Sequence, residues 1–226
     1  KPGKEDAPPG IVLISADKGL AGAFNSNVIG AAQRFAHERG GAAYYTVGLK
    51  ARNAIRRLGL ADRPAWALGA TSKIETARAA ACAATADFNR GAISEIVLVS
   101  QKLVSMMSQR PETRKLVPIL ASSFGTAPAG PAQDDKSSKG AIEFAPSPEF
   151  VLSRLLPKYL EFTIYSAMLE TDAAFFAAQL VAMTNATDNA SKLIDELTIA
   201  MNNARQAAIT KELLEIVAGA EALGVE

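Results

Sequence analysis

A turn that could hold phosphate follows the first apolar run of the chain. It spans Asp17 to Asn27 and comes directly after Ile11-Val12-Leu13-Ile14-Ser15. Nucleotide-binding folds cradle phosphate on backbone N–H groups at such strand-to-helix turns. Here the glycines, Gly19 and Gly22, do not form G-x-G-x-x-G, and no Gly-Lys-Ser/Thr triplet follows. The pattern favours a tight turn before a helix, in which Asn25 and Asn27 satisfy loop amides.

The chain has one cysteine and one histidine, which limits its site chemistry. Cys82 lies in the apolar run 79–84, so we expect a small buried hydrophobe there. His37 lies among charged residues of a predicted helix, where we expect a surface side chain. An internal disulfide is impossible, and a structural zinc site has too few ligands. We therefore assign no catalytic residue, no cofactor and no metal site to this sequence.

Composition excludes two broad classes of partner. The 226 residues are 49% apolar and 21% charged, with a formal net charge of +1, so no strong footprint for nucleic acid exists. No stretch approaches the ~18 consecutive apolar residues of a membrane-spanning helix, and we expect no direct membrane span. This is an ordinary composition for one domain with a core plus an extension.

Alternating strands and helices predict an α/β domain over residues 1–148, with a Rossmann-like, mostly parallel sheet. Ser26 or Asn27 could cap the first helix, which we expect to run to about Arg39. Residues 122–145 should form a mobile surface loop. The predicted strands are 11–15, 42–47, 95–100 and, at an edge, 115–120; the predicted helices cover 26–39, 51–58 and 74–89.

The last third of the chain predicts one long helix over residues 149–226. Between Lys158 and Ala218 there is no Gly and no Pro. These are about 60 residues, or roughly 90 Å of helix at ~1.5 Å per residue. A domain of about 150 residues is only ~35–40 Å across, so a helix laid over its own sheet cannot account for this length. Pro157 should kink the helix or lie close to its first turns.

The long helix carries a heptad, and its apolar seam predicts a coiled coil. We expect a partner helix, yet no second long heptad exists in this sequence. That helix must come from another chain or from a part of the protein outside this sequence. The seam consists of Met183, Thr187, Ala190, Ile194, Leu197, Met201, Ala204 and Ala208.

Past Ala208 the apolar face becomes broader, with charged residues beside it. Its large members are Ile209, Leu213, Ile216 and Val217. An apolar helix tip of this kind suits insertion into a socket of a partner protein.

Two segments resemble the gamma subunit of F-type ATP synthases. The first is the turn from Ser15 to Asn27, where Lys18, Ala21 and Ala23 depart mildly from the family pattern S-D-R-G-L-C-G-G. The second, more specific, runs from Met183 to Ala190, through Leu193-Ile194-Asp195-Glu196-Leu197, and from Asn203 to Leu223. The resemblance covers essentially the whole chain. The family begins with a long helix that pairs with the C-terminal one, and this sequence starts after it.

The resemblance implies an antiparallel coiled coil with the absent N-terminal helix and a central rotor shaft. Such a shaft has no active site and couples transmembrane proton flow to ATP synthesis by rotation. Its implied partners are the alpha and beta subunits of the catalytic hexamer, an epsilon-type subunit and the c-subunit ring. Its implied place is peripheral on the bacterial inner membrane, cytoplasmic side, or on the mitochondrial inner membrane, matrix side.

The resemblance also assigns contact residues. Arg205, Gln206, Thr210 and Glu212 would face loops of the catalytic subunits, with the planar fork of Arg205 the strongest candidate. Tyr159 and Tyr165 would contact other stalk subunits at the foot of the shaft, against the alternative of ordinary packing on the sheet.

Two other functions stay open from the residues alone. One is an enzyme with a doubly wound nucleotide-binding domain and an oligomerising tail, which would need a phosphate loop and convergent titratable groups. The other is a coiled-coil adaptor without a rotary role. It explains the heptad but not the residues from Asn203 to Leu223.

Overall fold

The computed structural model describes residues 7–60, 64–69, 72–118 and 148–224. Nine elements lie in these ranges. They are β1 (Gly10–Ile14), α1 (Phe24–Glu38), β2 (Ala43–Val47), α2 (Leu49–Arg57), β3 (Ala65–Trp66), α3 (Lys73–Asn89), β4 (Ile96–Ser105), β5 (Ser108–Val117) and α4 (Pro148–Leu223).

Two compact units can be distinguished, and each is considered by itself. The sheet unit comprises Lys1–Val181 and the helical unit comprises Ala182–Glu226. Helix α4 contributes its first part to the sheet unit because Leu160, Ile164 and Met168 are buried in the core there.

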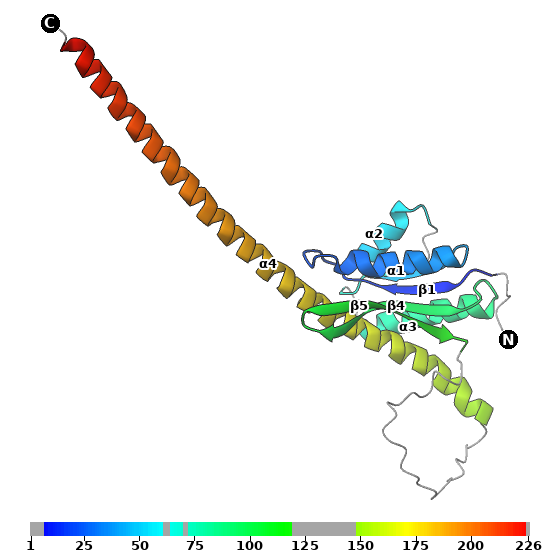
Figure 1. Ribbon diagram of the computed structural model, residues 1–226. Coiled ribbons are helices and arrows are strands. Elements are labelled where there is room, and N and C mark those ends of the chain that lie inside the picture. The colour runs from blue at the N-terminus through cyan, green and yellow to red at the C-terminus, as the bar shows by residue number, and fades with distance from the viewer. Residues whose placement is uncertain (1–6, 61–63, 70–71, 119–147, 225–226) are drawn as a thin grey trace, which may run out of the picture. The chain divides into compact units, whose positions relative to one another are not determined.

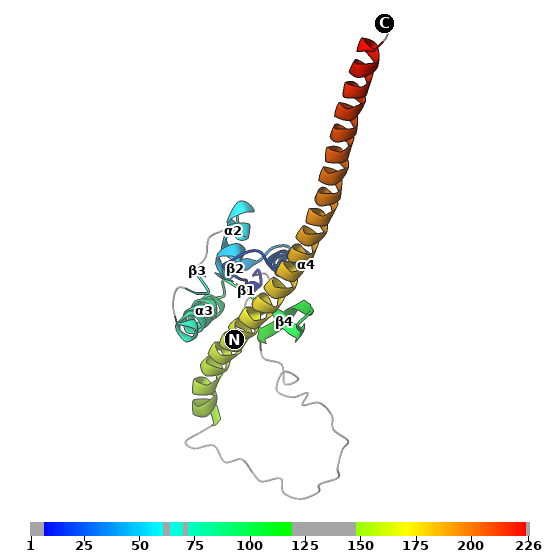
Figure 2. The same cartoon turned by 90° about the vertical axis from the view of Figure 1, so that its left-hand side faces the viewer.

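The sheet unit has three layers around a five-stranded sheet of order β3-β2-β1-β4-β5. Strands β1 to β4 are parallel, and β5 pairs antiparallel with β4. Helices α1 and α2 cover one face, and α3 with the first part of α4 covers the other (Figures 1 and 2). The expected mostly parallel α/β fold with a long C-terminal helix is confirmed.

Strand β1 is buried on both faces, as its unbroken apolar run predicted. Ile11 and Leu13 pack under α1 and α2, whereas Val12 and Ile14 pack toward α3 and α4. The alternation follows from the period of two in a strand. Each helical layer therefore has its own apolar cluster, and β1 joins them.

Several element boundaries differ from expectation. Helix α1 begins at Phe24, so Ser26 and Asn27 are not its cap; the Ser26 hydroxyl instead donates to Ala23 O at 2.9 Å within the first turn. The two-residue strand β3 was not predicted. Strand β5 begins at Ser108, earlier than expected, because the charged stretch 108–115 is an edge strand with one open side. The predicted loop 122–145 lies outside the described residues.

The prediction that Cys82 is buried is wrong, because its side chain is exposed. Helix α3 is so rich in alanine that its apolar face could not be read from the sequence. The face that packs on the sheet carries Ala77, Ala80, Ala81 and Ala84, and Cys82 points away from it. His37 is exposed, as expected.

Candidate functional site: an exposed helical surface and the turn after the first strand

Every large apolar side chain from Met183 to Val217 is exposed in the helical unit. Ile194, Leu197 and Met201 of the predicted seam are 63%, 60% and 63% exposed. Thr187, Ala190, Ala204 and Ala208 are exposed as well. Exposed apolar rows of this length mark a surface for another protein segment. The predicted seam residues thus lie on a helix and are exposed in the helical unit, and their pairing with another helix stays a prediction.

The tip residues lie on the same helix and are also exposed. Ile209, Leu213, Ile216 and Val217 are about half exposed or more, and Arg205, Gln206, Thr210 and Glu212 are open to solvent. Lys211 and Glu215 form an exposed ion pair of 3.8 Å one turn apart, which contributes little to stability. Exposed polar and apolar groups therefore occur together in this segment, and their contact with the catalytic subunits stays a prediction.

The two tyrosines expected at the foot have different surroundings. Tyr165 is partly buried and packs against the core cluster that contains Ile164 and Met168, so it contributes to the core of the sheet unit. Tyr159 is half-buried and lines a cavity of about 320 Å³ with Phe162, Glu112 and Arg114. Phe162 is 65% exposed beside it. Contact with another stalk subunit stays a prediction for both tyrosines.

The turn after β1 caps helix α2, which sequence reasoning did not foresee. Asp17 Oδ1 accepts the N–H of Leu49 at 2.8 Å, Ala16 O accepts that of Lys50 at 3.3 Å, and Ser15 Oγ accepts that of Ala51 at 2.8 Å. Three of the four unpaired N–H groups at the helix start are satisfied in this way. The only sequence signal for this cap is the Ser-x-Asp triplet after the first strand. The N–H groups that it binds lie more than thirty residues away in the chain.

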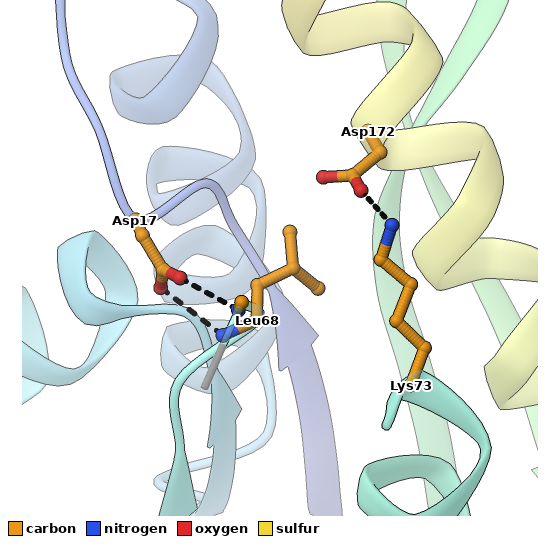
Figure 3. Close-up of polar contacts among 5 residues, drawn as sticks. Asp17, Leu68, Lys73 and Asp172 are labelled. Carbon is orange, nitrogen blue, oxygen red and sulfur yellow. Dashed lines mark hydrogen bonds and ion pairs between the residues drawn. The ribbon is translucent and has the colours of Figure 1, made fainter. Parts of the chain in front are cut away.

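The same Asp17 carboxylate also holds the segment after β3. Oδ1 accepts the N–H of Leu68 at 3.1 Å and Oδ2 that of Gly69 at 2.9 Å (Figure 3). The Asp17 carboxylate thus joins the turn after β1 to the start of α2 and to the segment after β3. Asn25 Oδ1 accepts the N–H of Ala16, as predicted for a loop amide, whereas Asn27 is an exposed residue of α1.

An apolar cluster packs beyond the ends of β1 and β4, in the region where ligands bind in such sheets. Phe24 and Phe175 pack edge to face there with ring centres 5.8 Å apart, beside Ala174 and Ala178 of α4. The buried Gln101 donates to Phe24 O at 2.8 Å. Apolar packing therefore occupies part of this end of the sheet.

An ion pair between Lys73 and Asp172 joins the start of α3 to α4 (Figure 3). Their side chains are 32% and 24% exposed. Both line a cavity of about 260 Å³ with Asp17, Leu68 and Phe175. A second pair, Arg78 with Glu161 at 3.4 Å, joins the same helices and leaves Arg78 59% exposed.

Within the described ranges, no helix is long and apolar enough to cross a bilayer, and no three acidic, His or Cys side chains gather to hold a metal ion.

Comparison with known proteins agrees with these features. A family model described as ATP synthase matches residues 2–223. The ATP synthase gamma chain of Heliobacterium modesticaldum is 38% identical over 216 residues, which cover 95% of this chain and 74% of that one. The gamma chain of Granulibacter bethesdensis is 40% identical over 220 residues, covering 94% and 73%.

Two solved structures share the fold at low identity. One chain comes from the Euglena gracilis mitochondrial ATP synthase, OSCP/F1/c-ring, with a TM-score of 0.67 and 18% identity, covering 96% of this chain and 73% of that one. Another comes from the central stalk and c-ring of the Tetrahymena thermophila enzyme, with a TM-score of 0.60 and 20% identity, covering 80% and 76%. On the family match and the relatives' identity over nearly its whole length, the chain belongs to the ATP synthase gamma chain family.

Proposed function

We propose that this chain is the turning shaft of a proton-driven ATP synthase and makes no bond to ATP itself. The gamma chain is the central-stalk rotor subunit of ATP synthase. Its task is mechanical coupling between two distant sites. The observation that carries the proposal is the helical unit, whose large apolar side chains from Met183 to Val217 are all exposed.

The seam of the helical unit would pair with a second helix in an antiparallel coiled coil. Burying a Leu or Ile side chain contributes about 1.5–3 kcal/mol to the free energy of association. Burial of Ile194, Leu197 and Met201 would therefore stabilise the pair of helices strongly. Ala190, Ala204 and Ala208 let the partner backbone approach closely. Two helices in a coil resist bending and twisting better than one, which a shaft requires.

The tip would turn inside a sleeve formed by the alpha and beta subunits of the catalytic hexamer. An apolar surface of Ile209, Leu213, Ile216 and Val217 in an apolar sleeve avoids a single deep electrostatic minimum. A few polar groups can still grip at certain angles. Arg205, Gln206, Thr210 and Glu212 are open to solvent and free to meet carboxylates or amides of the sleeve.

The sheet unit would be the foot of the shaft, with an epsilon-type subunit and the c-subunit ring as its neighbours. Tyr159 and Phe162 offer a partly exposed aromatic surface for such a contact. This arrangement makes the chain a peripheral part of the membrane complex. The cytoplasmic side of a bacterial inner membrane is the proposed location, and the matrix side of a mitochondrial inner membrane is the alternative.

Substituting the polar grip tests the proposal. Arg205→Ala with Gln206→Ala should lower ATP synthesis by the assembled enzyme about ten-fold, because a charge-assisted hydrogen bond is worth about 1.5–3 kcal/mol. The matched control is Ser191→Ala with Lys192→Ala, two exposed residues of the same helix outside the proposed set. Wild-type synthesis with the Arg205 and Gln206 double variant, or an equal loss in the control, would refute the assignment of this grip.

A further inference from the structure

The two carboxylates Glu170 and Asp172 of helix α4 engage different elements of the sheet unit. Glu170 Oε1 accepts the backbone N–H of Leu103 on β4 at 3.4 Å. Asp172 pairs with Lys73 at the start of α3. At ~100° per residue, two positions separate these side chains by about 200° around the helix. They therefore hold α4 on nearly opposite sides.

This geometry matters for twisting. A torque about the axis of α4 moves its two sides in opposite directions past their neighbours. Aliphatic packing, such as that of Ile164 and Met168 in the core, resists separation but has little directional preference. Hydrogen bonds and ion pairs depend on direction, so contacts of this kind on opposite sides of α4 are both strained when the helix rotates about its axis in either direction.

The position of Lys73 is unusual for a lysine. It is the first residue of α3, where the helix dipole disfavours a cation. The Asp172 carboxylate in front of it offsets this cost and itself gains from the dipole. The side chains of the pair are only partly exposed, so salt and water screen the pair less than a fully exposed one.

The contacts of Asp17 lie near the ion pair. Asp17 binds the backbone N–H groups of Leu68 and Gly69, which precede α3 in the chain. Asp17, Lys73 and Asp172 line the same cavity. Figure 3 shows Asp17 with Leu68 on one side of the site and Lys73 with Asp172 on the other.

We propose that the ion pair between Lys73 and Asp172 is a torque-bearing contact, and that Lys73 is a positioning residue that keeps α4 from twisting against the sheet unit. This inference rests on the proposed rotor function. Arg78 and Glu161 join the same two helices, but Arg78 is more exposed and starts no helix. That pair should carry far less of the load and serves as the matched control.

The test measures torsional stiffness in the complete enzyme. The hexamer is fixed to a surface, and a rotation probe is attached to Cys82, which is exposed on α3, with the other subunits free of cysteine. Lys73→Glu places two like charges together, and we expect the angular variance of the paused probe to rise roughly two-fold or more. Lys73→Asp combined with Asp172→Lys should restore the wild-type variance, and Arg78→Glu should leave it unchanged.

Wild-type variance in Lys73→Glu, an equal rise in Arg78→Glu, or no recovery in the charge swap would overturn the inference. If Lys73→Glu fails to assemble, Lys73→Met removes the charge but keeps the apolar stem, and it should show a smaller rise in the same measurement. An unchanged variance in Lys73→Met would then count against the pair. Failure of the wild-type chain to rotate would instead refute the proposed function.

Discussion

Gly48 allows the start of helix α2 to lie close to the turn that follows β1. It lies between β2 and α2 with φ of +103°, and a Cβ atom there would lie 2.1 Å from Ser15 O. Its N–H donates to Trp66 O at 2.7 Å. Only glycine allows the backbone of α2 to approach the Ser15–Asp17 turn so closely.

Replacing Gly48 by alanine should therefore be costly. We expect Gly48→Ala to lower the free energy of unfolding by about 3 kcal/mol, from backbone strain plus displacement of Ser15. Urea unfolding of the purified chain measures this. Gly40→Ala is the control, since Gly40 also has a positive φ of +73° but nothing lies within 4 Å of the added carbon. Equal losses in the two variants would show that the contact with Ser15 is unimportant.

Elements that depend on a local sequence pattern could be predicted, whereas features that depend on contacts between distant residues could not. β1 and the first part of β4 were read from unbroken apolar runs, and the heptad of α4 from its spacing. The start of α1 was missed because no side chain caps it, and the exposed side of α3 because alanine marks no face. Ser15 and Asp17 were missed because their hydrogen-bond partners lie in other elements. The polar contact residues of the helical unit, Arg205, Gln206, Thr210 and Glu212, were proposed from the family resemblance and not from any local pattern.

The seam of α4 makes its own prediction. Leu197→Asp should lower the yield of assembled rotor roughly ten-fold, because it places a charge where about 2 kcal/mol of apolar burial is expected. The stability of the isolated chain should not change, since Leu197 is already 60% exposed. Leu193→Asp is the matched control because Leu193 is 55% exposed but lies off the seam. The measurement is the yield of the complex in a pull-down assay. A loss of similar size in both variants would mean that the heptad does not define the contact.

At the scale of the whole molecule, the chain combines a packed sheet unit with a helical unit that buries little of its apolar surface. Asp17, Phe24 and Phe175 make contacts within the sheet unit. The large apolar side chains of the helical unit are exposed. This division fits the proposed role of a subunit that transmits force.

The most direct test of the central claim is native mass spectrometry of the assembly released from source membranes with this chain in it. The rotor account predicts that the chain travels with a hexamer of two larger kinds of subunit, and that Leu197→Asp weakens this association. If the chain is instead released alone or as a homodimer, the shaft has no bearing and the rotor account is contradicted.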